Sequence, residues 1–106
     1  IETMARYIIP SIERFRVSFS TDNGVTLDDC KWEVVYGVGT KRVTINKGVR
    51  IDENTVDVFL DTSLLGAGRL SAQLNVEFTD SDAPNGTRKK SIEITTNDYL
   101  DHGLSR

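Results

Sequence analysis

Cysteine and histidine each occur once in the 106-residue sequence, as Cys30 and His102. A single cysteine cannot form an intramolecular disulfide, so the fold is not expected to depend on an oxidising compartment. One cysteine and one histidine also supply too few ligands for a classical zinc site. Nucleophilic catalysis by Cys30 would need a base beside it, and the one histidine lies in a polar C-terminal segment. We therefore expect Cys30 to be an inert thiol that packs as a small hydrophobic residue.

Long apolar runs and a strong excess of one charge are also missing. No stretch approaches the length of a membrane span, so no membrane partner is expected. The formal net charge is −3, which gives no electrostatic reason to expect nucleic acid as a partner. The basic run at residues 88–90 is too short to change this, and lysines at a sheet edge commonly prevent edge-to-edge pairing.

Two short motifs are similar to known binding sites but lack essential parts. Residues 66–68 contain a Gly-x-Gly, yet the dinucleotide fingerprint needs a third glycine and a following helix. Asp80, Asp82 and Asn85 suggest a calcium loop, but Pro84 interrupts the required spacing. No acid and base can be placed together by spacing either. We expect no enzyme activity, no cofactor and no bound metal.

What the sequence does have is an alternation of apolar and polar residues nearly throughout. Such alternation is typical of antiparallel strands with one buried face. The stretches that show it are residues 14–19, 30–36, 42–45, 49–51, 56–61, 70–79 and 92–95. Turn signals separate them, including one at residues 21–24. Sustained helical spacing is missing, and Asp61 to Leu65 is the nearest candidate for a helical turn, capped by Asp61 or Thr62.

About seven short strands with turns between them predict an all-β fold, an immunoglobulin-like antiparallel β-sandwich. Residues 1–106 are expected to form a single domain, with its core over about 7–97 and a flexible C-terminal tail. Residues 7–9 are expected to form an edge strand that ends at Pro10. The side chains predicted to point inward are Phe15, Val17, Phe19, Trp32, Val34, Leu60, Leu74, Val76 and Ile94.

Two apolar residues, Val35 and Phe59, fall on the outward register of their strands. Each lies between two residues of the buried register. A contiguous exposed apolar patch usually marks an interface, so these two residues are the candidate interface of the domain, provided that their strands share one sheet. The alternative is that a terminal segment folds over them, because chain ends are often held as edge strands.

Several segments resemble, in their order, a domain of phage and prophage proteins of Bacteroidetes. They cover most of residues 7–97 and consist of strand and turn signatures. The segments are IIP at 8–10, FRVSF at 15–19, VTLDDCKWEV at 25–34, LDTSLLGAGRL at 60–70, DSDAPNGTR at 80–88 and TT at 95–96. The chain is similar in these segments to the N-terminal immunoglobulin-like domain of baseplate upper proteins and related tail-fibre proteins.

This resemblance implies a non-catalytic structural or assembly module of a phage tail, baseplate or fibre protein. Its partners would be other tail or baseplate proteins, or a second copy of itself. It would be found in the virion, or in the bacterial cytoplasm before assembly. The resemblance transfers no functional residue to this sequence. The alternative is a domain of a bacterial adhesin at the cell surface that binds carbohydrate or protein, a role that the same fold serves equally well.

Overall fold

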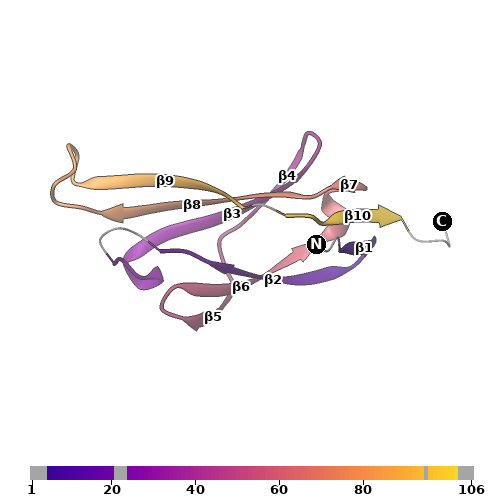
Figure 1. Cartoon of the computed structure of the whole chain (residues 1–106), viewed down its shortest axis with the longest axis horizontal. Helices are drawn as coiled ribbons and strands as arrows, with labels where there is room; N and C mark the ends of the chain where they lie inside the picture. Colours follow the sequence, from indigo (N-terminus) through magenta and orange to yellow (C-terminus); the bar gives the residue numbers. More distant parts are fainter. Residues whose placement is uncertain (1–4, 21–23, 95, 103–106) are drawn as a thin grey trace.

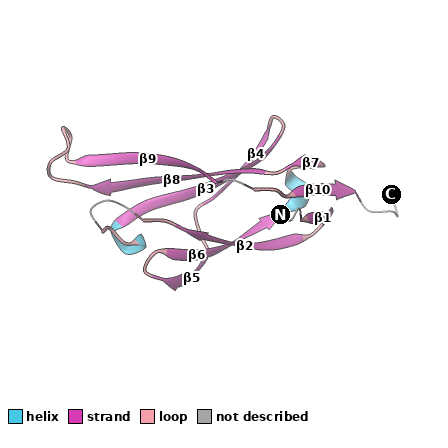
Figure 2. Cartoon of the chain, viewed as in Figure 1, coloured by secondary structure: helices cyan, strands magenta, loops and turns pink. Residues whose placement is uncertain are grey.

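The computed structural model describes residues 5–20, 24–94 and 96–102. These residues form strands joined by turns and two short 3-10 helices (Figure 2). The chain is therefore an all-β protein, and the prediction of a β-sandwich is confirmed. The turn predicted at residues 21–24 falls largely on residues 21–23, which lie outside the described residues.

The first sheet has the strand order β2-β6-β5 (Figure 1). It consists of β2 (Ile12–Ser18), β6 (Thr55–Asp61) and β5 (Val49–Asp52). All its pairs are antiparallel, and the pairing of β5 with β6 contains a register shift. Because side chains alternate along a strand, β6 turns Val58 and Leu60 into the core and presents Asp57 and Phe59 on the outer face.

The second sheet has the order β4-β3-β8-β9 and is also antiparallel. It consists of β4 (Lys41–Ile45), β3 (Cys30–Val38), β8 (Ser71–Thr79) and β9 (Thr87–Ile94). β9 begins at Thr87, earlier than the start predicted for this strand at residue 92. The basic run at residues 88–90 is therefore part of β9. Because β9 is an edge strand of this sheet, Lys89 and Lys90 still occupy positions that discourage edge pairing.

One hydrophobic core lies between the inner faces of these two sheets. Most of the predicted inward side chains are buried: Val17, Phe19, Val34, Leu60, Leu74 and Val76. The remaining three are partly buried and pack against this core: Phe15, Trp32 and Ile94. The alternation of apolar and polar residues thus predicted the direction of these side chains correctly.

A third, smaller sheet extends the core beyond its predicted end at residue 97. It joins β1 (Arg6–Ile9), β10 (Tyr99–His102) and β7 (Gly68–Arg69) in the order β1-β10-β7. β1 runs parallel to β10, so the expected edge strand before Pro10 is present. Leu100 is buried, which places part of the predicted flexible tail in the core. The tail prediction missed β10 because this short polar strand is stabilised by its distant partner β1.

The two short helices are η1 (Leu27–Asp29) and η2 (Thr62–Leu64). The second lies where the sequence predicted one helical turn. Asp61 caps it, since its side chain accepts a hydrogen bond of 3.1 Å from the backbone N–H of Ser63. Thr62 is fully buried and exchanges hydrogen bonds with Ser11, which ties the helix to the chain before β2.

Candidate functional site

The two candidate interface residues lie on different sheets. Val35 is on β3 of the second sheet, and Phe59 is on β6 of the first. The outer faces of these two sheets point in opposite directions because the core lies between them. Val35 and Phe59 therefore do not contribute to one patch, and the condition on which their joint interface depended is not met. Alternation predicts the face of a strand but not the sheet to which the strand belongs.

Val35 is partly buried and has polar neighbours. Thr44 on β4 and Gln73 on β8 lie directly across from it. Its side chain is thus a single apolar position within a polar surface. A scattered apolar residue of this kind is ordinary on protein surfaces.

Phe59 lies on the outer face of the first sheet, where exposed apolar side chains surround a charged cluster. Its neighbours on this face include Ile12 on β2 and Val49 on β5, which pair with Asp61 and Asp57 of β6. Ile12 is 70% exposed, Phe59 46% and Val49 45%. We call this surface the Phe59 face and define it by Ile12, Arg14, Arg16, Val49, Asp57 and Phe59. The alternative was that a terminal segment folds over this face. Within the described residues no terminal segment does so, and the terminal strands β1 and β10 pair with each other instead.

Asp57 is a buried carboxylate at the centre of the Phe59 face. Arg14 Nε donates a hydrogen bond of 2.7 Å to Asp57 Oδ2, and Arg16 donates to both carboxylate oxygens at 2.9 and 3.2 Å. Only 3% of the Asp57 side chain is exposed, whereas both arginines are at least half exposed. The Arg14 guanidinium also lies 5.4 Å from the centroid of the Phe59 ring, in a cation–π contact.

The two arginines lower the pKa of Asp57 from its ordinary value of 3.8 to about 2. The hydrogen bond from Arg16 is the largest cause, and that from Arg14 adds to it against the opposing effect of burial. Asp57 is therefore an ionised anchor that holds two cationic side chains in place. The sequence alone does not reveal this cluster, because the position of an Arg-x-Arg segment opposite an aspartate depends on the strand register.

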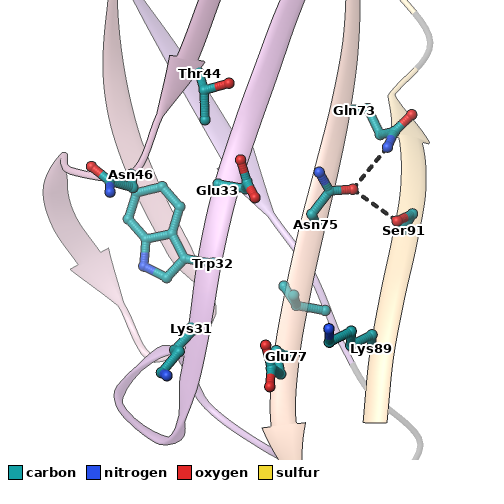
Figure 3. A pocket seen from close by; sticks show the side chains of 11 residues that line it. Lys31, Trp32, Glu33, Thr44, Asn46, Gln73, Asn75, Glu77, Lys89 and Ser91 are labelled. Carbon is teal, nitrogen blue, oxygen red and sulfur yellow. Dashed lines mark hydrogen bonds between the residues drawn. The ribbon is translucent and has the colours of Figure 1, made fainter.

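The outer face of the second sheet contains an open hollow of about 510 Å³ (Figure 3). We call it the polar hollow. Its lining comes from all four strands of the sheet and from Asn46, which follows β4. The lining includes Lys31, Trp32, Glu33, Thr44, Asn46, Gln73, Asn75, Glu77, Lys89 and Ser91. The alternation pattern did not indicate this site, because most of its members are ordinary outward polar residues on separate strands.

Cys30 lies on the inner face of β3, opposite Phe78 of β8. Its Sγ is 3.7 Å from the Leu27 carbonyl oxygen, to which the thiol donates. Burial, and then the charge of Asp29, raise the pKa of the thiol, while Arg50 opposes them. This placement agrees with a packed thiol; its lack of reactivity stays a prediction. His102 is exposed at the end of β10.

A search of the described residues found no group of three histidine, cysteine, aspartate or glutamate side chains arranged to hold a metal ion. Nor do these residues include a helix of the length and apolar character needed to cross a membrane. Compared with protein families, curated proteins and solved structures, the chain has no significant similarity to any of them.

Proposed function

We propose that the chain is a non-catalytic structural module of a phage or prophage tail, baseplate or fibre protein, acting through protein–protein contacts at the Phe59 face. The tail context comes from the resemblance of segments between residues 8 and 96. The contact surface comes from the arrangement of Phe59, Arg14 and Asp57 on the first sheet. The partner is another tail protein or a second copy of the chain.

The observation that supports this function is an exposed aromatic ring beneath an arginine that is already held in place. Aromatic and arginine side chains are enriched at protein interfaces and supply much of the binding energy. Because Asp57 orders Arg14 and Arg16 in the free domain, less side-chain entropy remains to be lost on binding. Ile12 and Val49 extend the apolar surface to either side of this charged centre.

An immunoglobulin-like topology is part of the proposal, and the strand order supports it. Such domains place strands B, E and D in one sheet and C, F and G in the other. In chain order, β2, β6 and β5 take the first set of positions, and β3, β8 and β9 take the second. Trp32 on β3 stands on the strand that carries the core tryptophan of many such domains. Domains of this type commonly serve as modules in larger assemblies.

The test is the assembly state of the domain across a wide range of concentrations, measured by sedimentation velocity. We expect the wild type to self-associate or to bind a protein encoded by a neighbouring gene. Phe59→Asp buries a charge in the contact and should weaken the association by at least about tenfold, equivalent to ~1.4 kcal/mol. Ile8→Asp is the matched control, because Ile8 is 52% exposed on the third sheet. It should associate as the wild type does.

A wild type that stays monomeric at every concentration and binds no product of a neighbouring gene would overturn the assembly role. That result would favour the alternative function, a domain of a bacterial surface adhesin. Equal weakening by Phe59→Asp and Ile8→Asp would place the contact elsewhere and contradict the role of the Phe59 face. Circular dichroism of each variant separates lost association from lost folding.

A further inference from the structure

The polar hollow has a group of uncharged hydrogen-bonding side chains on β8 and β9. Asn75 on β8 lies directly across from Ser91 on β9, and Gln73 precedes Asn75 by two residues on the same face. Thr44 and Asn46 contribute a second hydroxyl and a third amide from the opposite side. Ligand sites of small molecules have volumes of roughly 300–1,000 Å³, and the hollow of about 510 Å³ lies within this range.

A hydrogen-bond network gives three of these groups a defined orientation. Gln73 Nε2 and Ser91 Oγ each donate a hydrogen bond of 2.8 Å to Asn75 Oδ1 (Figure 3). This leaves the Asn75 amide nitrogen, with its two N–H donors, without a protein partner among the described residues. The Gln73 carbonyl and the lone pairs of Ser91 remain as acceptors. The hollow thus offers donors and acceptors side by side, and a row of hydroxyl groups, each both donor and acceptor, satisfies such a pattern.

The charges of the hollow balance, and one of them, the Glu33 carboxylate, lies directly across from Asn75. Lys31, Glu77 and Lys89 form a row across β3, β8 and β9, in which each charge faces its opposite, and Glu33 adds a second carboxylate. Two cations and two anions give no net attraction for phosphate or for a polyanion. The hollow also lies on the face of the sheet and not at an edge, so no unpaired backbone is offered to an extended peptide. A neutral, hydroxyl-rich ligand fits this surface best.

Trp32 belongs to the inward register of β3 and packs against the core, but its partly buried indole also reaches the border of the hollow. The pairing of β3 with β4 ends at Val34 and Ile45, so Trp32 lies beyond the end of β4. Its indole is consequently only partly buried and extends toward the side bordered by Asn46 (Figure 3). An indole offers an apolar face together with an N–H donor. The C–H face of a sugar ring packs on such a surface while its hydroxyls reach the amides.

We propose that the polar hollow is a binding site for a neutral oligosaccharide. The amide and hydroxyl groups of Gln73, Asn75 and Ser91 would bind the sugar hydroxyls, and Trp32 would contact a ring face. This site lies on the sheet opposite the Phe59 face and does not depend on the protein contacts proposed there. A domain with both sites would attach to its assembly by one sheet and to a glycan by the other.

Trp32 is the only tryptophan of the chain, so all tryptophan fluorescence comes from this one position at the border of the hollow. The experiment titrates the intact chain with neutral hexasaccharides of glucose, mannose, xylose and N-acetylglucosamine, and repeats each titration by calorimetry. We expect at least one of them to bind in a saturable manner and to change the Trp32 emission. Asn75→Ala and Ser91→Ala should each weaken binding roughly threefold to tenfold, the value of one or two neutral hydrogen bonds.

Two control variants on the opposite sheet separate this proposal from the proposed assembly role. Ser18→Ala removes a hydroxyl that interacts with Thr55 on the outer face of the first sheet, and it should bind saccharide as the wild type does. Phe59→Asp should likewise keep its saccharide affinity even where it loses association. Failure of one proposal therefore leaves the other standing.

The proposal is overturned if no hexasaccharide of the panel binds by either method. It is also overturned if Asn75→Ala and Ser91→Ala bind as tightly as the wild type, because the sugar would then occupy another surface. Binding of heparin or inorganic phosphate in place of the neutral sugars would contradict the charge argument. Thermal unfolding of each variant verifies that lost binding does not reflect lost folding.

Discussion

The two main sheets share one core but differ in the chemistry of their outer faces. On the first sheet, a buried carboxylate, Asp57, holds two arginines beside the exposed ring of Phe59. On the second, amides and a hydroxyl around Asn75 form a neutral network within an open hollow. Strand pairing thus gives one face a rigid, apolar and charged surface and the other a polar one. The first suits contact with protein, and the second suits a hydrated small ligand.

The difference arises from which strands become neighbours. Arg14 and Arg16 stand two residues apart on β2, and the register of β2 with β6 places Asp57 within reach of both. On the second sheet, the register brings Asn75 beside Ser91. The strands of both sheets alternate between apolar and polar residues in the same way. The inner faces of the two sheets are therefore both apolar, while their outer faces differ in chemistry.

The largest expected effect is on the core that both sheets share. Leu60→Ala on the first sheet and Leu74→Ala on the second should each lower the free energy of unfolding by about 2–5 kcal/mol, since both side chains are buried. Urea denaturation measures this loss. The outer-face neighbours provide the controls: Phe59→Ala and Gln73→Ala should each cost less than about 1 kcal/mol. If Phe59→Ala cost as much as Leu60→Ala, the assignment of inner and outer faces on β6 would be wrong.

Much of the fold was predictable because alternation depends on local sequence. The inward side chains of β2, β3 and β8 follow directly from their spacing, and the cap of η2 by Asp61 follows from a local hydrogen bond. β10 was not predicted, because its four residues pair with β1 at the other end of the chain. The early start of β9 was missed for a similar reason: a run of basic residues shows no alternation, and pairing with β8 makes it a strand.

The candidate site was predictable only in part. The outward direction of Phe59 is a property of its own strand, and the structure agrees with it. Whether Phe59 and Val35 form one interface patch depends on which strands share a sheet. That in turn depends on contacts between segments that are distant in the sequence. The burial of Asp57 and the network around Asn75 have the same origin. A sequence read one strand at a time contains the members of each site but not their grouping.

A smaller effect is expected on acid stability, and it tests the charged centre of the Phe59 face. The pKa of Asp57 is about 2 in the folded chain, against its ordinary value of 3.8, which applies to the unfolded chain. A group whose pKa is lowered by folding stabilises the fold above its unfolded pKa and loses this contribution as pH falls. Wild-type stability should therefore decrease between about pH 4 and pH 2 through this residue. Denaturation midpoints across this range measure the decrease.

Asp57→Asn removes the titrating group and should flatten the acid dependence over the same range, while lowering stability at neutral pH because two arginines lose their anchor. Glu77→Gln removes a carboxylate from the other outer face without touching Arg14 or Arg16. Glu77→Gln is therefore the matched control, and the acid dependence of its stability should follow that of the wild type. An acid profile of Asp57→Asn that is identical in shape to that of the wild type would show that the arginine cluster contributes nothing to acid stability.

The smallest expected effect concerns Cys30, a probe of the inner face of the second sheet. Burial raises the pKa of its thiol, so less of the reactive thiolate forms near neutral pH. Labelling by a thiol reagent should therefore be much slower in the native chain than in urea. Asp29→Asn removes a charge that raises this pKa and should speed labelling slightly, while Arg50→Gln should slow it. Native labelling at the rate of the unfolded chain would contradict the inert thiol, because the inner face of β3 would then be open to solvent.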